Sequence, residues 1–333
     1  MDDSRVLLSG FSDEAAADKT PDQQFSVMAA LGLRHVSLRF VDCGRGVRNI
    51  LDLEPAERQQ LRNRLDDYGL AVSSIGSPIG KIRIADIEDG SGNRYVPFPE
   101  YLDQDLRRAV EAAEDLDCRL IRGFSFYHPR GSDPEDWFNA SVERLGQIAG
   151  ICDRHGLTFG LEVEANLIGH TGDRLARIHE AVSSPALVLV FDGGNLVTQG
   201  MGRDQVRAQF HAMLPGLGWM HVKDYRGPSN HRQGWIDEEQ LAHFVPADCG
   251  EAGHRTLFED LKPRLAELTG RLQQRGIPGF FVDLEPHLKG GGQFGGYSGA
   301  DGMGIACRAL CHVLDQAGIS SDRATWSQPG AKK

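Results

Sequence analysis

The sequence has no cysteine pair in a CxxC arrangement, no block of basic residues and no long apolar run. Its six cysteines are scattered along 333 residues, which argues against a zinc ribbon and gives no sign of a disulfide framework. Lysine and arginine number 36 against 47 aspartates and glutamates, a net charge of −11. An acidic chain of this kind is a poor binder of nucleic acid or of a membrane surface. We therefore expect neither as a partner.

The N-terminus also lacks the pattern of a secretory signal. The segment MDDSRVLLSGFSDE carries acidic residues where a signal peptide carries basic ones, and its apolar run is far too short. No stretch approaches the roughly 20 apolar residues of a membrane span. Hydrophobic residues make up 40% of the chain, which is ordinary for a globular protein. We expect a cytoplasmic protein with a large core.

Strand-like and helix-like segments alternate along the whole chain. Each of eight short apolar segments is followed by a helix-patterned one, and continuously apolar strands are typical of a parallel sheet buried on both faces. The expected strands cover residues 5–11, 35–40, 70–78, 118–126, 157–164, 186–192, 217–224 and 279–286. Eight such units without a change in composition predict a single (β/α)8 TIM barrel.

We expect this barrel to form one domain over residues 1–319, followed by a flexible polar tail over residues 320–333. The alternative is a doubly wound sheet. That fold binds dinucleotides through a GxGxxG turn after its first strand, whereas this chain has Ser-Gly-Phe-Ser-Asp-Glu there. The barrel is therefore the preferred prediction.

Ionisable residues lie at the ends of the later strands, where a barrel has its active site. A charged residue at the tip of an apolar strand is costly unless it is paired or bound to a metal. These residues are Glu162, Glu164, Asp192, His221, Lys223, Asp224, Glu285 and His287. Carboxylates and an imidazole from four consecutive strands suit a divalent ion such as Mn²⁺, Mg²⁺ or Co²⁺. The alternative is a polar network at the barrel mouth in which lysines and arginines pair the acids.

The segments GLEVEAN, VFDGGN, MHVKD and DLEPHL, in this order, resemble the sugar isomerase/epimerase superfamily with a xylose-isomerase-like TIM barrel. The resemblance covers nearly the whole chain and implies one divalent metal ion, with Mn²⁺ favoured. The implied ligands are Glu164, Asp192, His221 and Glu285. Glu162 points the same way as Glu164, because alternate residues of a strand share a face. We choose Glu164 because it lies nearer the mouth and precedes Ala-Asn, and we place Glu162 a layer deeper.

Shorter motifs narrow the resemblance. SPIGKI (77–82), FSFY (124–127) and EPHL (285–288) resemble a branch that includes the α subunits of C-glycoside deglycosidases and 3-keto-sugar lyases. The stretch EANLIGH departs from the pattern expected of that branch. The resemblance implies a small-molecule sugar or glycoside as substrate. We also expect a homo-oligomer, with or without a small partner subunit.

Other residues near the strand ends are candidates for proton transfer and substrate binding. Histidine titrates near neutral pH. A desolvated lysine near a metal can have a lowered pKa and act as a base, or it can stabilise an oxyanion. The predicted catalytic residues are Glu164, Glu285, His128 and Lys223. The predicted substrate-binding residues are Arg39, Lys81, Asn195 and His287. Asn195 could instead cap the helix after Asp192, and Arg39 could instead neutralise the acidic mouth.

The reaction expected from such a site begins with removal of a proton next to a metal-bound carbonyl. Return of the proton gives epimerisation or isomerisation, whereas loss of a β-substituent gives elimination. The local motifs favour β-elimination from a 3-keto-glycoside, with a sugar isomerase or epimerase as the alternative. Two further hypotheses are an endonuclease-IV-like DNA-repair enzyme, which needs a histidine-rich three-zinc cluster, and a sugar-binding barrel without catalysis.

Overall fold

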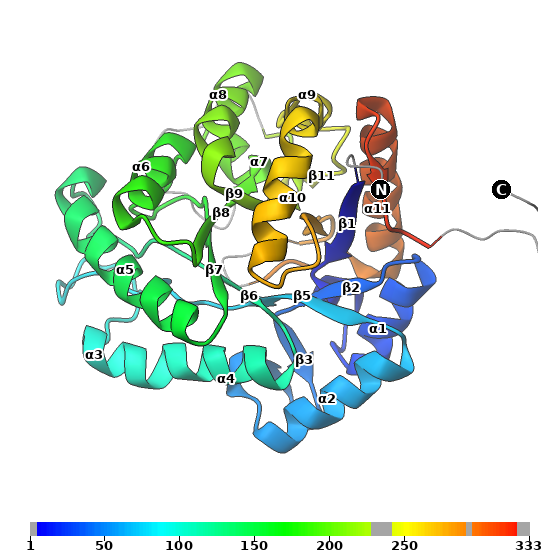
Figure 1. Ribbon diagram of the computed structural model, residues 1–333, viewed down its shortest axis with the longest axis horizontal. Coiled ribbons are helices and arrows are strands. Elements are labelled where there is room, and N and C mark those ends of the chain that lie inside the picture. Colours follow the sequence, from blue (N-terminus) through cyan, green and yellow to red (C-terminus); the bar gives the residue numbers. More distant parts are fainter. Residues whose placement is uncertain (1–4, 228–241, 291–294, 325–333) are drawn as a thin grey trace, which may run out of the picture.

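Eight parallel strands form the centre of the molecule and helices surround them, as the computed structural model of the chain shows for residues 5–227, 242–290 and 295–324 (Figure 1). The barrel strands are β1 (Arg5–Gly10), β2 (His35–Leu38), β5 (Ala71–Gly76), β6 (Leu120–Gly123), β7 (Thr158–Glu162), β8 (Leu187–Asp192), β9 (Leu217–Val222) and β12 (Phe281–Leu284). Their spatial order is β1-β12-β9-β8-β7-β6-β5-β2. A parallel bridge between Phe11 and Ser37 brings the ends of this order together. The predicted (β/α)8 barrel is confirmed, and the doubly wound alternative is wrong.

Helices follow the strands as the apolar periodicity predicts. They are α1 (Pro21–Ala30), α2 (Pro55–Asp67), α3 (Phe98–Tyr101), α4 (Arg107–Asp115), α5 (Phe138–Arg154), α6 (Gly172–Val182), α8 (Arg203–Met213), α9 (His254–Leu261), α10 (Leu265–Gln274) and α11 (Gly299–Ala317). Proline at the first position of α1 and of α2 sets the helical φ where no backbone N–H is needed. A π-helical segment, Leu102–Leu106, joins α3 to α4 without a break.

Short elements lie at the mouth of the barrel. They are the antiparallel pair β3 (Phe40–Asp42) and β4 (Val47–Asn49), the helix α7 (Gly193–Val197), and the antiparallel pair β10 (Asp224–Tyr225) and β11 (Phe244–Val245). Short 3-10 turns also occur, among them Ser12–Ala15 directly after β1. Among the described residues, no helix is both long and apolar enough to cross a membrane.

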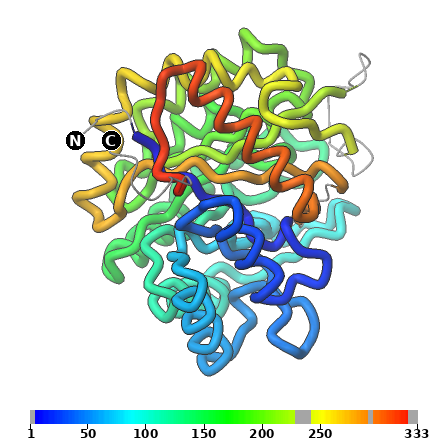
Figure 2. The backbone as a smooth tube through the Cα atoms, turned by 90° about the vertical axis from the view of Figure 1, so that its right-hand side faces the viewer, coloured from blue at the N-terminus to red at the C-terminus, as the bar shows by residue number. Residues whose placement is uncertain are grey.

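The structure describes the first residues of the expected tail. Residues Ser320–Ser321 form β13, which pairs in parallel with the start of β1, and Asp322 accepts a hydrogen bond from the backbone N–H of Leu8 at 2.7 Å. Figure 2 shows the C-terminal helix lying beside the first strand. Residues 320–324 therefore pack against the barrel, and residues 325–333 of the expected tail lie outside the described residues.

The barrel interior is closely filled beneath its mouth. Trp219 of β9 is fully buried and lies against Gly160 of β7, where a Cβ would come within 1.9 Å of the indole. Only glycine fits at that position without moving the ring. The indole N–H donates to Nε2 of His221, two residues further along β9, at 3.2 Å. The packed interior thus supports the layer in which the ionisable residues meet.

Candidate metal centre

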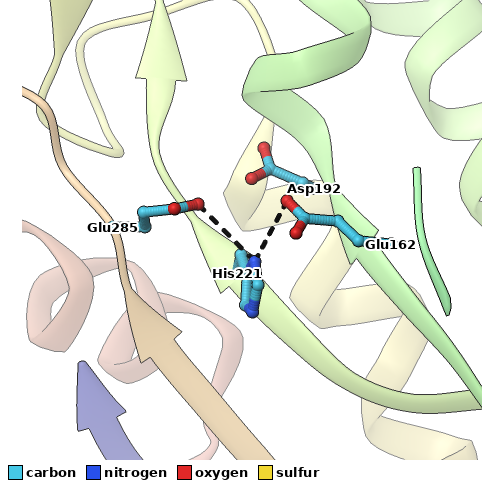
Figure 3. Close-up of side chains that lie close together, drawn as sticks. All are labelled: Glu162, Asp192, His221 and Glu285. Carbon is cyan, nitrogen blue, oxygen red and sulfur yellow. Dashed lines mark ion pairs between the residues drawn. The ribbon is translucent and has the colours of Figure 1, made fainter. Parts of the chain in front are cut away.

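Four side chains from four consecutive strands converge at the carboxyl ends of the barrel. Glu162 ends β7, Asp192 ends β8, His221 lies near the end of β9, and Glu285 follows β12 directly. One ligand atom from each lies within 4.8 Å of the others, and all four residues are buried. Figure 3 shows Glu162 and Glu285 on opposite sides of the His221 ring. We call these four residues the carboxylate–histidine cluster.

The parallel register explains why the four side chains meet. Asp192 is paired with His221, and Glu162 is paired with Val190, two residues before Asp192. Side chains of paired residues point to the same face, so Glu162, Asp192 and His221 all point into the barrel. The N–H of Glu285 donates to the carbonyl of Val222 at 3.2 Å, which fixes the fourth residue beside the third.

Glu162, and not the predicted Glu164, belongs to this cluster. The strand β7 ends at Glu162, and two further residues carry the chain roughly 6–7 Å towards the mouth. Glu164 instead forms an ion pair with Lys81, with Nζ 2.8 Å from Oε1. The Lys81 ammonium also lies over the ring of Phe124, 4.4 Å from its centroid. The structure thus places Glu162 in the cluster, where the prediction had Glu164, and Glu164 and Lys81 form a separate pair.

Cations supplied by the protein contact the cluster. Lys223 Nζ lies 2.9 Å from Asp192 Oδ2 and 2.7 Å from Glu285 Oε2. Arg122 Nε lies 3.4 Å from Glu162 Oε2. The predicted pairing of mouth acids by lysine and arginine therefore occurs here. It accompanies the cluster rather than replacing it, since His221 Nδ1 is buried without a hydrogen-bond partner among the described residues.

The charges shift the pKa values in opposite directions. Burial alone would raise the pKa of Glu162, but His221 and Arg122 lower it to about 2. Burial raises the pKa of Asp192 to about 6, although Lys223 opposes the shift. Burial would lower the pKa of Lys223, but Asp192 and Glu285 raise it above its ordinary value. Of the two roles that the sequence leaves open for Lys223, a base with a lowered pKa does not fit this shift, and the ammonium keeps its proton at neutral pH.

The donor set and its dimensions fit one divalent ion. His221 Nδ1 lies 3.2 Å from Glu162 Oε1 and 3.5 Å from Glu285 Oε2. Ligands at about 2.0–2.4 Å on opposite sides of an ion lie at most about 4.8 Å apart, and the ligand atoms of the cluster all lie within that distance of one another. Oxygen and imidazole donors together suit a hard or borderline ion. Glu162, Asp192, His221 and Glu285 could therefore hold such an ion.

A second group of ionisable residues adjoins Glu285. Arg39 Nη1 lies 2.9 Å from Glu285 Oε1, and its Nε lies 3.2 Å from Asp13 Oδ2. Glu14 Oε1 lies 2.7 Å from His287 Nδ1 and 3.7 Å from the guanidinium. Glu14, Glu285 and His287 come close enough to hold an ion, but the Arg39 guanidinium already pairs with both carboxylates. This contact fits the neutralising alternative for Arg39, and its role in substrate binding stays a prediction.

The remaining predicted residues take different places. Asn195 donates through Nδ2 to Glu162 Oε1 at 3.2 Å and to Val163 O at 3.0 Å, and its backbone N–H is capped by Asp192 Oδ1 at 3.1 Å. It therefore holds the cluster in position. His128 lies in the loop after β6, where its Nδ1 contacts Pro129 O at 3.1 Å, and it is not part of the cluster. His287 is buried with a φ of 50°, a conformation that non-glycine residues rarely adopt.

Asp13 and Glu14 were missed by the sequence reasoning. Both are fully buried in the turn after β1, in the segment Ser-Gly-Phe-Ser-Asp-Glu. The rule that selected the later residues, an acid at the carboxyl end of an apolar strand, also applies to this first strand. The signal was therefore present in the sequence.

The fold and the cluster define a class: a (β/α)8 barrel with a carboxylate–histidine cluster at the carboxyl ends of its strands. A family model described as the xylose isomerase-like TIM barrel matches residues 25–289. This chain belongs to that family. A search of curated protein sequences finds no significant match.

Solved structures share the fold over most of their length. One is a xylose isomerase-like TIM barrel protein from Mycobacterium smegmatis in complex with magnesium (17% identity, TM-score 0.59, covering 94% of this chain and 96% of that one). Another is the D-psicose 3-epimerase of Clostridium cellulolyticum H10 with D-tagatose (13%, 0.59, 94% and 98%). A third is the probable 3-DHS dehydratase AsbF of Bacillus anthracis (16%, 0.59, 92% and 98%). At these identities the likeness shows the fold alone, and the resemblance to C-glycoside deglycosidases stays a prediction.

Proposed function

We propose that this chain is a divalent-metal-dependent enzyme that removes the proton next to the carbonyl of a keto-sugar. The observation that carries the proposal is the buried cluster of Glu162, Asp192, His221 and Glu285, whose ligand atoms lie within 4.8 Å of one another. A bound ion such as Mn²⁺ or Mg²⁺ would polarise the carbonyl and acidify the adjacent C–H. The solved magnesium complex of a protein with the same fold supports this choice of ion.

The protein's own groups are arranged for proton transfer on both sides of the site. Glu162 and Glu285 lie on opposite sides of His221 (Figure 3), and the pKa of each is held below its ordinary value despite burial. Both are therefore ionised at neutral pH and able to accept a proton. Lys223 keeps its proton between Asp192 and Glu285, where it is placed to donate to a developing negative charge.

We favour β-elimination from a 3-keto-glycoside as the outcome. The motifs after strands β5, β6 and β12 support it, and the dehydratase among the similar folds performs an elimination by its title. In this proposal Glu162 or Glu285 takes the C2 proton, and the C1 substituent leaves with a proton from a neighbouring acid such as Lys223. The electron pair of the C–H bond becomes the new double bond, so no external oxidant or reductant is needed.

The second candidate is a sugar epimerase or isomerase. Two carboxylates on opposite faces of one site are what an epimerase needs to remove a proton from one side and return it to the other. The same fold occurs in a D-psicose 3-epimerase. Lys81, Arg39 and His287 are proposed to contact the substrate in either reaction. The cytoplasmic location and the homo-oligomer stay predictions.

Product NMR in D₂O separates the two outcomes. The protein, loaded with Mn²⁺ and then freed of excess ion, is incubated with 3-keto-glycosides and with free ketoses. Elimination predicts release of the aglycone and an unsaturated keto-sugar, whereas epimerisation predicts deuterium in an intact sugar. Activity that survives exhaustive chelation would contradict the metal-dependent proposal. Deuterium uptake without any release would remove the lyase in favour of the epimerase.

A further inference from the structure

Asp283 is a carboxylate buried beside His221. It lies in β12 and is paired with Ser9 of β1 on one side and with His221 of β9 on the other. Its side chain is fully buried, and neither carboxylate oxygen has a hydrogen-bond partner among the described residues. Its Oδ2 lies 4.0 Å from His221 Nε2. A buried carboxylate in this condition is costly, so a partner is expected in some state of the protein.

The two nitrogens of His221 suggest what that partner is. Nε2 accepts a hydrogen bond from the indole N–H of Trp219 at 3.2 Å. A neutral imidazole that accepts at Nε2 carries its proton on Nδ1, the nitrogen that faces Glu162 and Glu285. In this tautomer the Nδ1 proton occupies the place that a cation would take among the carboxylates.

Binding of a cation reverses the tautomer. A metal ligand must offer a lone pair, so Nδ1 would lose its proton and Nε2 would carry one. Trp219 cannot accept that proton's hydrogen bond, because an indole N–H is only a donor. Among the described residues, the acceptor without a hydrogen-bond partner on that side of the ring is Asp283.

We propose that Asp283 is a positioning residue that accepts the Nε2–H of His221 when Nδ1 binds the ion, and so fixes the ring and its tautomer for metal binding. This inference rests on the proposed metal-dependent function. It goes beyond that function because Asp283 is no ligand and touches no substrate. A carboxylate or carbonyl behind a ligating histidine orients the ring and raises its basicity.

The test compares Asp283→Leu, which removes the acceptor, with Asp283→Asn, which keeps an acceptor oxygen of the same reach. Calorimetric titration with Mn²⁺ at fixed pH should show affinity lowered by about 10–100-fold in Asp283→Leu and by far less in Asp283→Asn. In ¹⁵N-histidine NMR with Zn²⁺ as a diamagnetic probe, the wild type should move its His221 proton from Nδ1 to Nε2 on loading. A His221→Gln variant assigns the signal.

The controls separate the possible failures. The thermal midpoint of the metal-free protein should fall little in Asp283→Leu, because neither carboxylate oxygen has a hydrogen-bond partner at bonding distance among the described residues; a large fall would assign Asp283 a structural role and overturn the inference. A wild type that binds no Mn²⁺ would remove the proposed function as well. If Asp283→Leu binds Mn²⁺ as tightly as the wild type does, the role of Asp283 is contradicted and the proposed function is not. If Asp283→Leu does not fold, the NMR of the wild type and of Asp283→Asn decides: an Nε2–H signal absent from both loaded proteins contradicts the inference.

Discussion

Two carboxylate sites lie within a few residues of each other at the end of β9, and they are built in opposite ways. Asp224 accepts three backbone hydrogen bonds, from Tyr225 and Ala252 to Oδ1 at 2.9 Å each and from Gly250 to Oδ2 at 3.1 Å. We call this arrangement the Asp224 loop. The carboxylate–histidine cluster instead gathers three acids around His221 Nδ1, which is buried and has no hydrogen-bond partner in the part of the chain that the structure describes.

The difference shows how a buried charge is able to serve either stability or chemistry. Backbone N–H groups fill the lone pairs of Asp224, so this carboxylate holds the segment before α9 closed and has little left to offer a ligand. The cluster has buried polar atoms at the strand ends that have no hydrogen-bond partner among the described residues. A bound ion or ligand would give these atoms a partner. Substitutions in the two sites should therefore separate stability from metal binding.

The largest effect is expected from Glu162→Gln compared with Glu164→Gln. The first removes a charge from the cluster and should lower Mn²⁺ affinity by at least about tenfold, with a larger loss of turnover. The second breaks only the ion pair with Lys81 and should change Mn²⁺ affinity by less than about threefold. Calorimetry on both variants measures the difference. Equal losses would show that Glu164 also ligates the ion, as the sequence first suggested.

The next effect is on stability, in Asp224→Ala. The variant leaves three backbone N–H groups without their charged acceptor, and the free energy of unfolding should fall by about 2–4 kcal/mol. Urea denaturation of the metal-free protein provides the measurement. Gly250→Ala is a second route to the same outcome, because its Cβ would lie 2.0 Å from Asp224 Oδ1. Mn²⁺ affinity measured in the folded protein should stay unchanged. A loss comparable to that of Glu162→Gln would contradict the separation of stability from metal binding in the two sites.

The smallest effect concerns Asp322, at the opposite end of the barrel. Burial alone would raise its pKa, but hydrogen bonds with His35 and with the N–H of Leu8 lower it. Because the folded-state pKa lies below the unfolded one, ionised Asp322 stabilises the protein at neutral pH, and this contribution disappears as the pH falls through about 4 and below. Asp322→Asn should therefore be less stable by about 1 kcal/mol at pH 7, and the difference should narrow in acid. Thermal melts across pH 3–7 test this, and a constant difference would contradict it.

The fold was accessible from the sequence because buried parallel strands are continuously apolar. All eight predicted strands occur, each somewhat shorter than its apolar run. The same shortening caused the error at β7: the run over residues 157–164 continues past the true end at Glu162. Pattern alone cannot say which of two acids on one face lies level with neighbouring strands, because the level depends on the pairing register.

The sequence allowed lysines and arginines to pair the acids at the mouth, but it could not predict which residue pairs with which. Arg39 and Glu285 are 246 residues apart yet lie within 2.9 Å, and nothing in local composition joins them. The sequence could not decide between the two roles open to Lys223 for the same reason, since burial was foreseeable and two carboxylates within 2.9 Å were not. Asp192, His221 and Glu285 were correctly brought together because each ends, or nearly ends, an apolar strand.

The position of Lys223 bears on how the protein acquires its ion. Its ammonium already occupies oxygens of Asp192 and Glu285, so the acids are compensated before any ion arrives. Loading the site as proposed would then be an exchange of one cation for another. The newly synthesised chain should therefore fold without metal. A chelator should leave a folded, metal-free protein that is able to bind the ion again, and it should not unfold the chain.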